Sequence, residues 1–334
     1  MYSLHFYGQM LADAPRMEAY AAALRHTVKP DSVVMDLGSG PGVFALLACK
    51  LGARRVYAVE PDGVISLARE AAAANGFADR IEFFENFSTA ITVPEPASII
   101  VSDLRGVLPW FQQHIPSIKD ARTRLLARNG VLIPHRDILW AAVVEAPDRY
   151  DELVGPWQNN KFELNLSAGT RLITNTWRKT RIKPEQLLVE PICWTRIDYY
   201  EVESPDIRAE IYWQAARKGT AHGVAVWFDS ELVDGIGFSN RPDAPEMIYG
   251  NGLFPFSQPV EVMEGERIRL RLAARMVNDD YVWRWDTDFF ARDDEAHPKV
   301  SFKQSTFFGV PLSQAQLRKL SQKDSVKSVD GLSR

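Results

Sequence analysis

Short apolar runs alternate with longer amphipathic stretches through the first 134 residues. Ser32–Leu37 and Arg54–Glu60 are typical of buried parallel strands, because each is a short, largely apolar run that includes or ends in an acid. Val43–Leu51 and the alanine-rich Gly63–Asn75 have the length and spacing of helices. Further strands are expected at Ile81–Phe84, Ala97–Asp103 and Val131–Ile133, with a helix over Ile118–Ala127. This alternation predicts a doubly wound parallel sheet of the α/β class.

The pattern changes after Pro134, where apolar and polar residues begin to alternate along extended stretches. Such alternation is typical of strands in an antiparallel unit, and tryptophans along these stretches are expected to fill its core. The expected strands include Ile138–Val144, Ile192–Val202, Ile207–Ala215, Val224–Phe228 and Ile268–Ala274. We therefore predict an α/β domain over 1–134, a β domain over 135–310 and a polar tail over 311–334.

Composition narrows the class of protein. The 46% hydrophobic and 25% charged content is ordinary for a globular enzyme, and the net charge of −4 argues against a broad surface for nucleic acid or anionic membrane. No apolar run is long enough to span a bilayer, and the start lacks a basic region followed by an apolar one, so we expect a cytoplasmic protein. Two cysteines and six scattered histidines have no metal-ligand spacing, so no metal is expected.

A glycine-rich loop, Gly38-Ser39-Gly40-Pro41-Gly42, lies between the first predicted strand and helix. Glycines let the backbone turn sharply and let a ligand approach the main chain, and the helix that follows offers free N–H groups to an anion. The spacing is G-x-G-x-G with Asp36 two residues ahead, which differs from the G-x-G-x-x-G of dinucleotide sites. The loop therefore favours the amino-acid part of S-adenosylmethionine over a pyrophosphate.

Glu60 supports a nucleoside ligand, because it ends the second predicted strand 20 residues beyond Gly40. An acid at that place can accept hydrogen bonds from both ribose hydroxyls. An NAD site remains the competing interpretation, since Glu60 would serve its ribose equally well.

The motifs resemble those of the protein arginine methyltransferase family across nearly the whole chain. The segment Gln9–Tyr20 resembles the family's first motif, and Val34–Gly42 and Val59-Glu60 resemble its cofactor motifs. Later landmarks include Pro184–Leu187, Gly237–Ser239, Pro242 and Gly265-Glu266. The resemblance implies a Rossmann-like methyltransferase domain at 1–134, which binds S-adenosylmethionine, followed by an antiparallel β-barrel domain. It also implies a homodimer formed by a dimerisation arm at about 162–180.

The resemblance also implies the residues that bind the cofactor. Arg16 would pair with the methionine carboxylate and Met10 would pack near the sulfonium. Gly38, Ser39 and Gly40 with Asp36 would form the loop, Glu60 would hold the ribose, and Phe87 and Ser88 would flank adenine. Because little chain precedes the first motif, Tyr2, Phe6 or Tyr7 would supply a short lid.

The expected acceptor site departs from the family. In the family two glutamates bind the substrate guanidinium, because this group stays protonated and its cation must be oriented by carboxylates. Here these positions are Asp103 and Gln112, and Arg105 adds a cation that would pair with Asp103, face a substrate carboxylate or point to solvent. Asp13 is kept, but the histidine that normally partners it is Ile248.

These residues predict an S-adenosylmethionine-dependent methyltransferase, with Asp103 as the acid that orients the acceptor and Gln112 and Arg105 beside it. A nitrogen of a peptide or protein, with arginine first, is the acceptor that the resemblance implies. A small-molecule N- or O-methyltransferase and a cofactor-binding scaffold without catalysis are the alternatives. No nucleic-acid partner is expected, because the segment after the fourth strand lacks the motif used for flipped bases.

Overall fold

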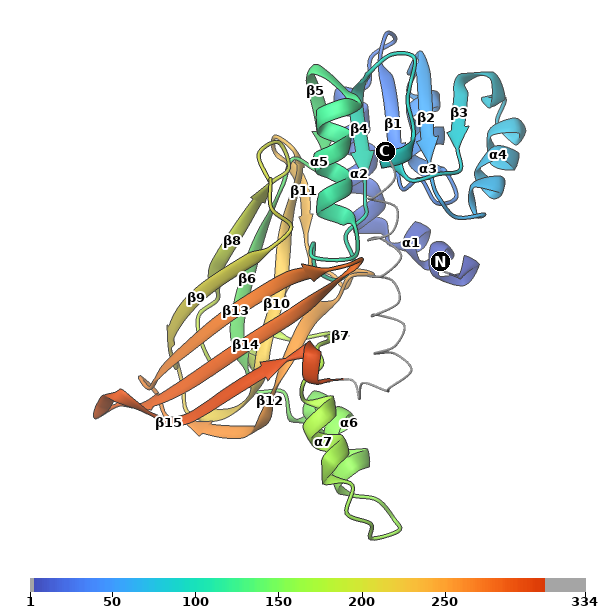
Figure 1. Ribbon diagram of the computed structural model, residues 1–334. Helices are drawn as coiled ribbons and strands as arrows, with labels where there is room; N and C mark the ends of the chain where they lie inside the picture. The colour runs from blue at the N-terminus through green and yellow to red at the C-terminus, as the bar shows by residue number, and fades with distance from the viewer. Residues whose placement is uncertain (1–2, 310–334) are drawn as a thin grey trace, which may run out of the picture.

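Five parallel strands form the sheet of the N-terminal domain, in the order β3-β2-β1-β4-β5 (Figure 1). The computed structural model describes residues 3–309, so Tyr2 and the tail at 311–334 lie outside the described residues. The strands are β1 Val33–Leu37, β2 Arg55–Val59, β3 Ile81–Phe84, β4 Ala97–Ser102 and β5 Leu126–Ile133. The strand order reverses between β1 and β4, and such a reversal leaves a crevice at the carboxyl ends of the strands. The predicted doubly wound sheet is confirmed.

Helices flank this sheet and one of them differs from the prediction. They are α1 Leu4–Ala12, α2 Ala14–Thr27, α3 Val43–Lys50, α4 Ile65–Ala74 and α5 His114–Arg124, with single 3-10 turns at Ala78–Arg80 and Ser88–Ala90. The helix expected over Ile118–Ala127 begins earlier, because Pro116 lies in the first turn, where its missing N–H costs nothing. The helix also ends earlier, and β5 includes Asn129 at a φ of 61° where its pairing with β4 shifts register. No helix within residues 3–309 is long and apolar enough to cross a membrane.

Two antiparallel sheets form the C-terminal domain, with strand orders β7-β12-β10-β6-β8 and β15-β14-β13-β9, and with β11 beside β10. Their strands are β6 Arg136–Val144, β7 Arg178–Thr180, β8 Ile192–Asp198, β9 Ile207–Gln214, β10 Gly219–Val233, β11 Ile236–Ser239, β12 Asn251–Val262, β13 Arg267–Val277, β14 Asp280–Ala291 and β15 Asp294–Ser305. Single 3-10 turns lie at Pro184–Gln186 and Thr306–Phe308. The sheets enclose fully buried aromatic side chains, including Trp283, Trp285 and Phe254, as expected for a barrel core.

A pair of helices projects from the barrel (Figure 1), and we call it the arm: α6 Pro147–Gln158, the loop 159–166 and α7 Ser167–Ile173. The arm begins and ends earlier than the predicted 162–180. Trp177 stacks on Phe254 of the barrel at 5.8 Å between ring centroids, and it therefore belongs to the barrel side. At the tip, Phe162 is 68% exposed and Leu164 is 59% exposed.

The two domains share one hydrophobic core. The buried cluster that includes Met35 and Ile100 of the parallel sheet continues through Leu139 of β6 into Trp283 of the barrel. The link between the domains is short, because β5 ends at Ile133 and β6 begins at Arg136. This packing fixes the carboxyl ends of β1, β2 and β4 against the barrel.

Candidate functional site

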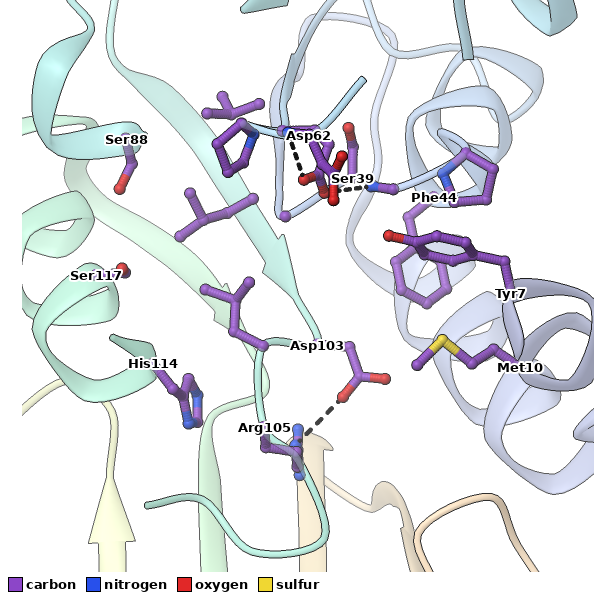
Figure 2. A pocket seen from close by; sticks show the side chains of 18 of the residues that line it. Tyr7, Met10, Ser39, Phe44, Asp62, Ser88, Asp103, Arg105, His114 and Ser117 are labelled. Carbon is purple, nitrogen blue, oxygen red and sulfur yellow. Dashed lines mark hydrogen bonds and ion pairs between the residues drawn. The ribbon is translucent and has the colours of Figure 1, made fainter. Parts of the chain in front are cut away.

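A cavity of about 480 Å³ opens at the carboxyl ends of β1, β2 and β4 (Figure 2), and we call it the first cavity. Tyr7 and Met10 of α1 face Asp103 across it. All the predicted site residues except Asp36 line this cavity: Met10, Arg16, Gly38, Ser39, Gly40, Glu60, Phe87, Ser88, Asp103, Arg105 and Gln112. Residues that lie far apart in the sequence therefore converge on one site.

The glycine loop needs its glycines at two positions. Gly38 has a φ of 73° and Gly40 a φ of 51°, in the region that L side chains rarely adopt. A Cβ at Gly38 would lie 2.2 Å from Leu104 Cδ2, and one at Gly40 would lie 2.8 Å from Tyr7 Cε1. The loop is thus packed so closely between α1 and the segment after β4 that only glycine fits.

Glu60 lies at the floor of the first cavity and braces the glycine loop. Its carboxylate accepts hydrogen bonds from the backbone N–H of Gly40 at 2.9 Å and of Asp62 at 3.0 Å. Burial raises the pKa of Glu60, although these two amides act in the opposite direction. A carboxylate accepts about four hydrogen bonds, so Glu60 keeps capacity for the two hydroxyls of a ribose.

Asp36 lies behind the loop rather than in the first cavity. Its Oδ2 accepts a hydrogen bond from Ala45 N at 2.9 Å, which ties β1 to the first turn of α3. Burial raises its pKa to about 7. Asp36 therefore stabilises the glycine loop through its hydrogen bond to α3 and does not line the first cavity.

Ser39 offers a test of whether the first cavity suits a polar ligand. Its hydroxyl oxygen is buried and has no hydrogen-bond partner among residues 3–309. Buried hydroxyls are costly without a partner, so a lone hydroxyl in a cavity wall points to a missing donor or acceptor. The amino-acid part of S-adenosylmethionine, which carries an ammonium and a carboxylate, fits that need.

Phe87 and Ser88 form another part of the cavity wall. Phe87 is 60% exposed and is therefore not a core aromatic. Its ring is available to stack on a planar ligand. Ser88 is buried, and its carbonyl accepts a hydrogen bond from Arg124 Nη2 at 2.8 Å. The arrangement suits an adenine, which needs one flat apolar contact and a polar edge.

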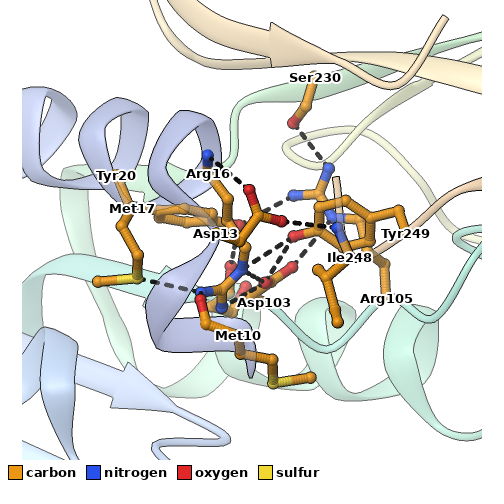
Figure 3. Close-up of polar contacts among 11 residues, drawn as sticks. Met10, Asp13, Arg16, Met17, Tyr20, Asp103, Arg105, Ser230, Ile248 and Tyr249 are labelled. Atoms are coloured by element: carbon orange, nitrogen blue, oxygen red, sulfur yellow. Dashed lines mark hydrogen bonds and ion pairs between the residues drawn. The ribbon is translucent and has the colours of Figure 1, made fainter. Parts of the chain in front are cut away.

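Asp103 is the centre of a buried polar network (Figure 3). Its Oδ2 lies 2.6 Å from Arg16 Nη2 and 2.7 Å from Arg16 Nε, and it accepts a hydrogen bond from Tyr249 Oη at 2.7 Å. Burial by itself raises the pKa of Asp103, but the positive charges of Arg16 and Arg105 lower it by more. The net pKa is therefore below its usual value, and the carboxylate stays ionised. Its Oδ1 lies 3.4 Å from Arg105 Nε and has no hydrogen-bond partner in the described part of the chain.

Arg105 is buried, so the expectation that it points to solvent is wrong. Its Nη1 lies 2.6 Å from Asp137 Oδ1 of β6 and 2.7 Å from Ser230 Oγ of β10, and its Nη2 lies 3.1 Å from Tyr20 Oη of α2. Its side chain is 0% exposed. Arg105 therefore joins the two domains and lies close to Asp103. A substrate carboxylate was one of its expected partners, but protein groups already bind its guanidinium.

Asp13 keeps a partner even though the family's histidine is absent. Its Oδ2 accepts a hydrogen bond from the backbone N–H of Ile248 at 2.7 Å, so the main chain replaces the missing side chain. Gln112 lines the first cavity in an exposed position, with a φ of 43° that is unusual for a residue other than glycine. Among residues 3–309, the side chains that donate hydrogen bonds to Asp103 are Arg16 and Tyr249 rather than Gln112.

Sequence reasoning missed Tyr249 and His114. Tyr249 follows Ile248, and only the fold brings its hydroxyl to Asp103. His114 lines the first cavity, its Nδ1 lies 2.8 Å from the Pro109 carbonyl, and burial lowers its pKa to about 4, so the ring is neutral at pH 7. No local pattern marks Tyr249, because it acquires its partner Asp103 through tertiary packing.

Comparisons with known proteins match both domains. The family model described as the arginine methyltransferase oligomerization subdomain matches residues 135–288, and that of the ribosomal protein L11 methyltransferase matches residues 19–133. Protein arginine N-methyltransferase 2 of Mus musculus is 31% identical over 283 residues, which cover 79% of this chain and 62% of that protein. Arginine N(omega)-methyltransferase of Streptomyces achromogenes subsp. streptozoticus is 28% identical over 274 residues, which cover 79% of this chain and 74% of that protein.

Solved structures share the fold. The Trypanosoma brucei PRMT1 enzyme-prozyme heterotetrameric complex with AdoHcy matches with a TM-score of 0.80 at 21% identity, over 91% of this chain and 98% of that one. Arabidopsis thaliana protein arginine methyltransferase 10 matches with a TM-score of 0.78 at 22% identity, over 91% and 97%.

The fold and the site define a methyltransferase-type α/β domain joined to an antiparallel β-barrel domain. The chain is similar to members of the protein arginine methyltransferase family across both domains. It spans 62% of the length of the Mus musculus relative and 61% of that of the probable protein arginine N-methyltransferase 6 of Arabidopsis thaliana.

Proposed function

We propose that the protein is an S-adenosylmethionine-dependent methyltransferase and that the first cavity binds the cofactor. The observation that carries this proposal is the convergence of the glycine loop, Glu60 and the exposed ring of Phe87 on one cavity of about 480 Å³. The unpartnered hydroxyl of Ser39 supports a polar ligand there. The Trypanosoma brucei relative, whose printed description includes AdoHcy, has the same fold. The matched relatives are named as arginine methyltransferases, which makes nitrogen the acceptor atom that we propose.

Different residues of the first cavity would bind different parts of the cofactor. Glu60 accepts hydrogen bonds from the ribose hydroxyls, and Phe87 packs on the adenine. Arg16 still has an N–H for the methionine carboxylate, because a guanidinium carries five N–H donors and Asp103, Tyr249, Met10 and Met17 do not use all of them. Ser39 and the N–H groups at the start of α3 complete the contacts to the amino-acid part.

When bound, S-adenosylmethionine supplies an electrophilic methyl group on a sulfonium. Methyl transfer is an in-line displacement, so the protein mainly has to hold the acceptor close and aligned. Asp103 is the group that we propose for this task, because it lies in the cavity wall opposite Tyr7 and Met10 and its carboxylate stays ionised. Met10 and Tyr7 of α1 line the cavity opposite Asp103.

We further propose that two copies of the chain associate through the arm. The matched oligomerization subdomain includes the arm, and its tip exposes Phe162 and Leu164. Exposed apolar groups of this size are uncommon on a monomer unless they meet a partner.

A reducing, cytoplasmic location also remains our proposal. Cys49 is buried and Cys193 is partly buried, and both are free thiols. Burial raises the pKa of Cys49 to about 11, so its thiol stays protonated and unreactive.

Binding of S-adenosylhomocysteine tests the proposed cofactor site. Calorimetry should detect the ligand, and Glu60→Ala should weaken binding about tenfold to a hundredfold, because a charge-assisted hydrogen bond contributes roughly 1.5–3 kcal/mol. Glu70→Ala removes an exposed acid on α4 and should leave the affinity unchanged. Tight binding of NADH together with no response to S-adenosylhomocysteine would sink the proposal.

A scaffold without catalysis is the second candidate, and one observation favours it. Arg16 and Tyr249 already occupy Oδ2 of Asp103, and Oδ1 is buried and lies 3.4 Å from Arg105 Nε, so protein groups engage the whole carboxylate. A scaffold would bind S-adenosylhomocysteine normally but transfer no methyl group to any acceptor in a cell extract.

A further inference from the structure

A second pocket, of about 330 Å³, lies at the base of the arm, and none of its described lining residues lines the first cavity. We call it the arm-base pocket. Its wall comes from α6, from β7 with the residue that follows it, and from the segment before β12. The charged side chains in this wall are Arg149, Glu152, Arg178, Lys179, Arg181 and Glu246. Cations outnumber acids by two, although the whole chain has a net charge of −4.

Main-chain carbonyls, rather than acids, hold two of these cations in place. Arg181 Nη2 donates hydrogen bonds to the carbonyl of Pro242, at 3.2 Å, and to that of Ala244. Lys179 Nζ donates one to the carbonyl of Ile248. A carbonyl orients a cationic side chain but has no net charge with which to neutralise it. Both cations are therefore fixed in position before any ligand arrives, which lowers the entropic cost of binding an anion.

The two acids compensate only part of the positive charge. Glu152 Oε1 lies 2.8 Å from Arg149 Nη1, and these two side chains form an ion pair. The charge of Glu246 raises the pKa of Lys179, whereas burial lowers it. Each acid thus acts on one cation of the wall.

The excess of positive charge lies on Arg178 and Arg181, which have no ion pair among residues 3–309. The side chain of Arg178 is exposed and makes no hydrogen bond within the same residues, so all five of its N–H donors are available to a ligand. Arg181 acts differently, because its Nη1 is buried without a partner in the described chain. It contributes its charge to the pocket rather than a direct hydrogen bond.

Gly250 allows β7 to approach the segment before β12 closely at the wall of the pocket. Its φ is 58°, in the region that L side chains rarely adopt. A Cβ at this position would lie 2.7 Å from the Thr180 carbonyl oxygen and 3.1 Å from Lys179 Cε. Another residue would therefore displace β7 and the lysine, so the shape of the pocket depends on this glycine.

An anion with two negative charges matches these cations best. A phosphate monoester carries about −1.5 to −2 charges at pH 7 and offers three acceptor oxygens. Guanidiniums bind phosphate through two parallel N–H···O bonds, which a pocket lined by three arginines can supply. A carboxylate has a single charge and would leave part of the excess uncompensated.

We propose that the arm-base pocket is a binding site for a phosphate group. Arg178 and the N–H groups of Arg149 that Glu152 does not engage donate hydrogen bonds to its oxygens. A phosphate in this position bridges α6 of the arm and β7 of the barrel domain. The inference is independent of the proposed methyltransferase function.

Calorimetric titration of the full chain with inorganic phosphate at pH 8 tests this inference, with acetate as the monoanion for comparison. Phosphate should bind about tenfold more tightly than acetate, because its second charge has a second cation to meet. Arg178→Gln should weaken phosphate binding about tenfold to a hundredfold, the effect of losing a charge-assisted hydrogen bond. Arg128→Gln removes an exposed arginine on β5 outside the pocket and should leave the affinity unchanged.

Glu152→Gln should act in the opposite direction. This change removes an anion from the wall and releases the guanidinium of Arg149, so phosphate should bind more tightly. A variant that merely loosened the base of the arm would bind phosphate more weakly instead. Because a ligand that binds the folded state stabilises it, the Tm of the unmodified protein should also rise with phosphate concentration, and that of Arg178→Gln should rise less.

A phosphoserine peptide separates the two sources of such a group. Tighter binding of the peptide than of inorganic phosphate would identify a phosphorylated protein segment as the ligand, and the reverse order would identify a free small molecule. The inference is overturned if phosphate binds no more tightly than acetate, if Arg178→Gln and Arg128→Gln bind it equally, or if Glu152→Gln fails to strengthen binding. S-adenosylhomocysteine should bind Arg178→Gln as it binds the unmodified protein, so the two proposals fail separately.

Discussion

Asp103 shows how a residue's role depends on its neighbours rather than on its own type. Its carboxylate lies between two buried guanidiniums, of Arg16 and Arg105, and accepts a hydrogen bond from Tyr249. Each partner comes from a different element, namely α2, the segment after β4 and the segment before β12. The same carboxylate thus connects the first cavity with the interface between the domains.

Substitution of Asp103 tests this network through stability. Asp103→Asn leaves two buried cations with less compensation and should lower the free energy of unfolding by about 3–5 kcal/mol. Tyr249→Phe removes one hydrogen bond to a charged group and should cost about 1.5–3 kcal/mol. Urea unfolding followed by tryptophan fluorescence measures both, with Tyr212→Phe, an exposed tyrosine on β9, as the control. An Asp103→Asn variant as stable as the unmodified protein would show that the network is not as drawn.

At this scale, the sequence predicts the residues whose role is local. Gly38, Gly40 and Glu60 could be assigned from spacing, because a loop between a strand and a helix defines their surroundings. Arg105 could not be assigned, since Asp137 is 32 residues away and Ser230 is 125 residues away in the chain. The role of Tyr249 could not be predicted for the same reason, because its partner Asp103 is 146 residues away in the chain.

The arm is the element whose place in the fold carries a prediction of its own. Its base is anchored, because Ile173 packs on the buried cluster of Tyr150, Leu153 and Val154. Its tip has no such support within residues 3–309, and Phe162 and Leu164 remain largely exposed. An anchored base with an exposed apolar tip is the arrangement expected of an interaction element.

Removing the apolar tip should therefore dissociate the proposed dimer. The unmodified protein should sediment at micromolar concentration as a species of twice 37.7 kDa, and the double variant Phe162→Ser with Leu164→Ser should sediment as a monomer. Leu67→Ser, which alters an exposed leucine on α4, should leave the dimer intact. A monomeric unmodified protein would refute the dimer.

The elements themselves were predictable to different extents. The five strands expected in the α/β domain and the five named after Pro134 all overlap observed strands, because their apolar periodicity is strong. The strands β7, β11, β12, β14 and β15 of the barrel domain were not among those expected. The start of α5 was missed because Pro116 is tolerated in a first turn. The bounds of the arm were missed because α6 and α7 are stabilised by contact with each other and with the barrel, which no local pattern records.

The whole molecule is organised around the junction of its two domains. A continuous core runs from β1 and β4 into the barrel, and Arg105, which lines the first cavity, is buried at this junction. The Arg105–Asp137 pair crosses the same junction from the segment after β4 to β6. The sequence predicts two domains, but only the fold shows that Asp103 of the first cavity accepts a hydrogen bond from Tyr249 of the C-terminal domain.

A crystal structure with S-adenosylhomocysteine tests the central claim most directly, namely that the first cavity holds the cofactor with its sulfur toward Asp103. We expect the ribose hydroxyls on Glu60, the carboxylate near Arg16 and Ser39, and the sulfur between Met10 and Asp103. A ligand bound outside the first cavity, or one whose sulfur faces away from Asp103, would contradict the account.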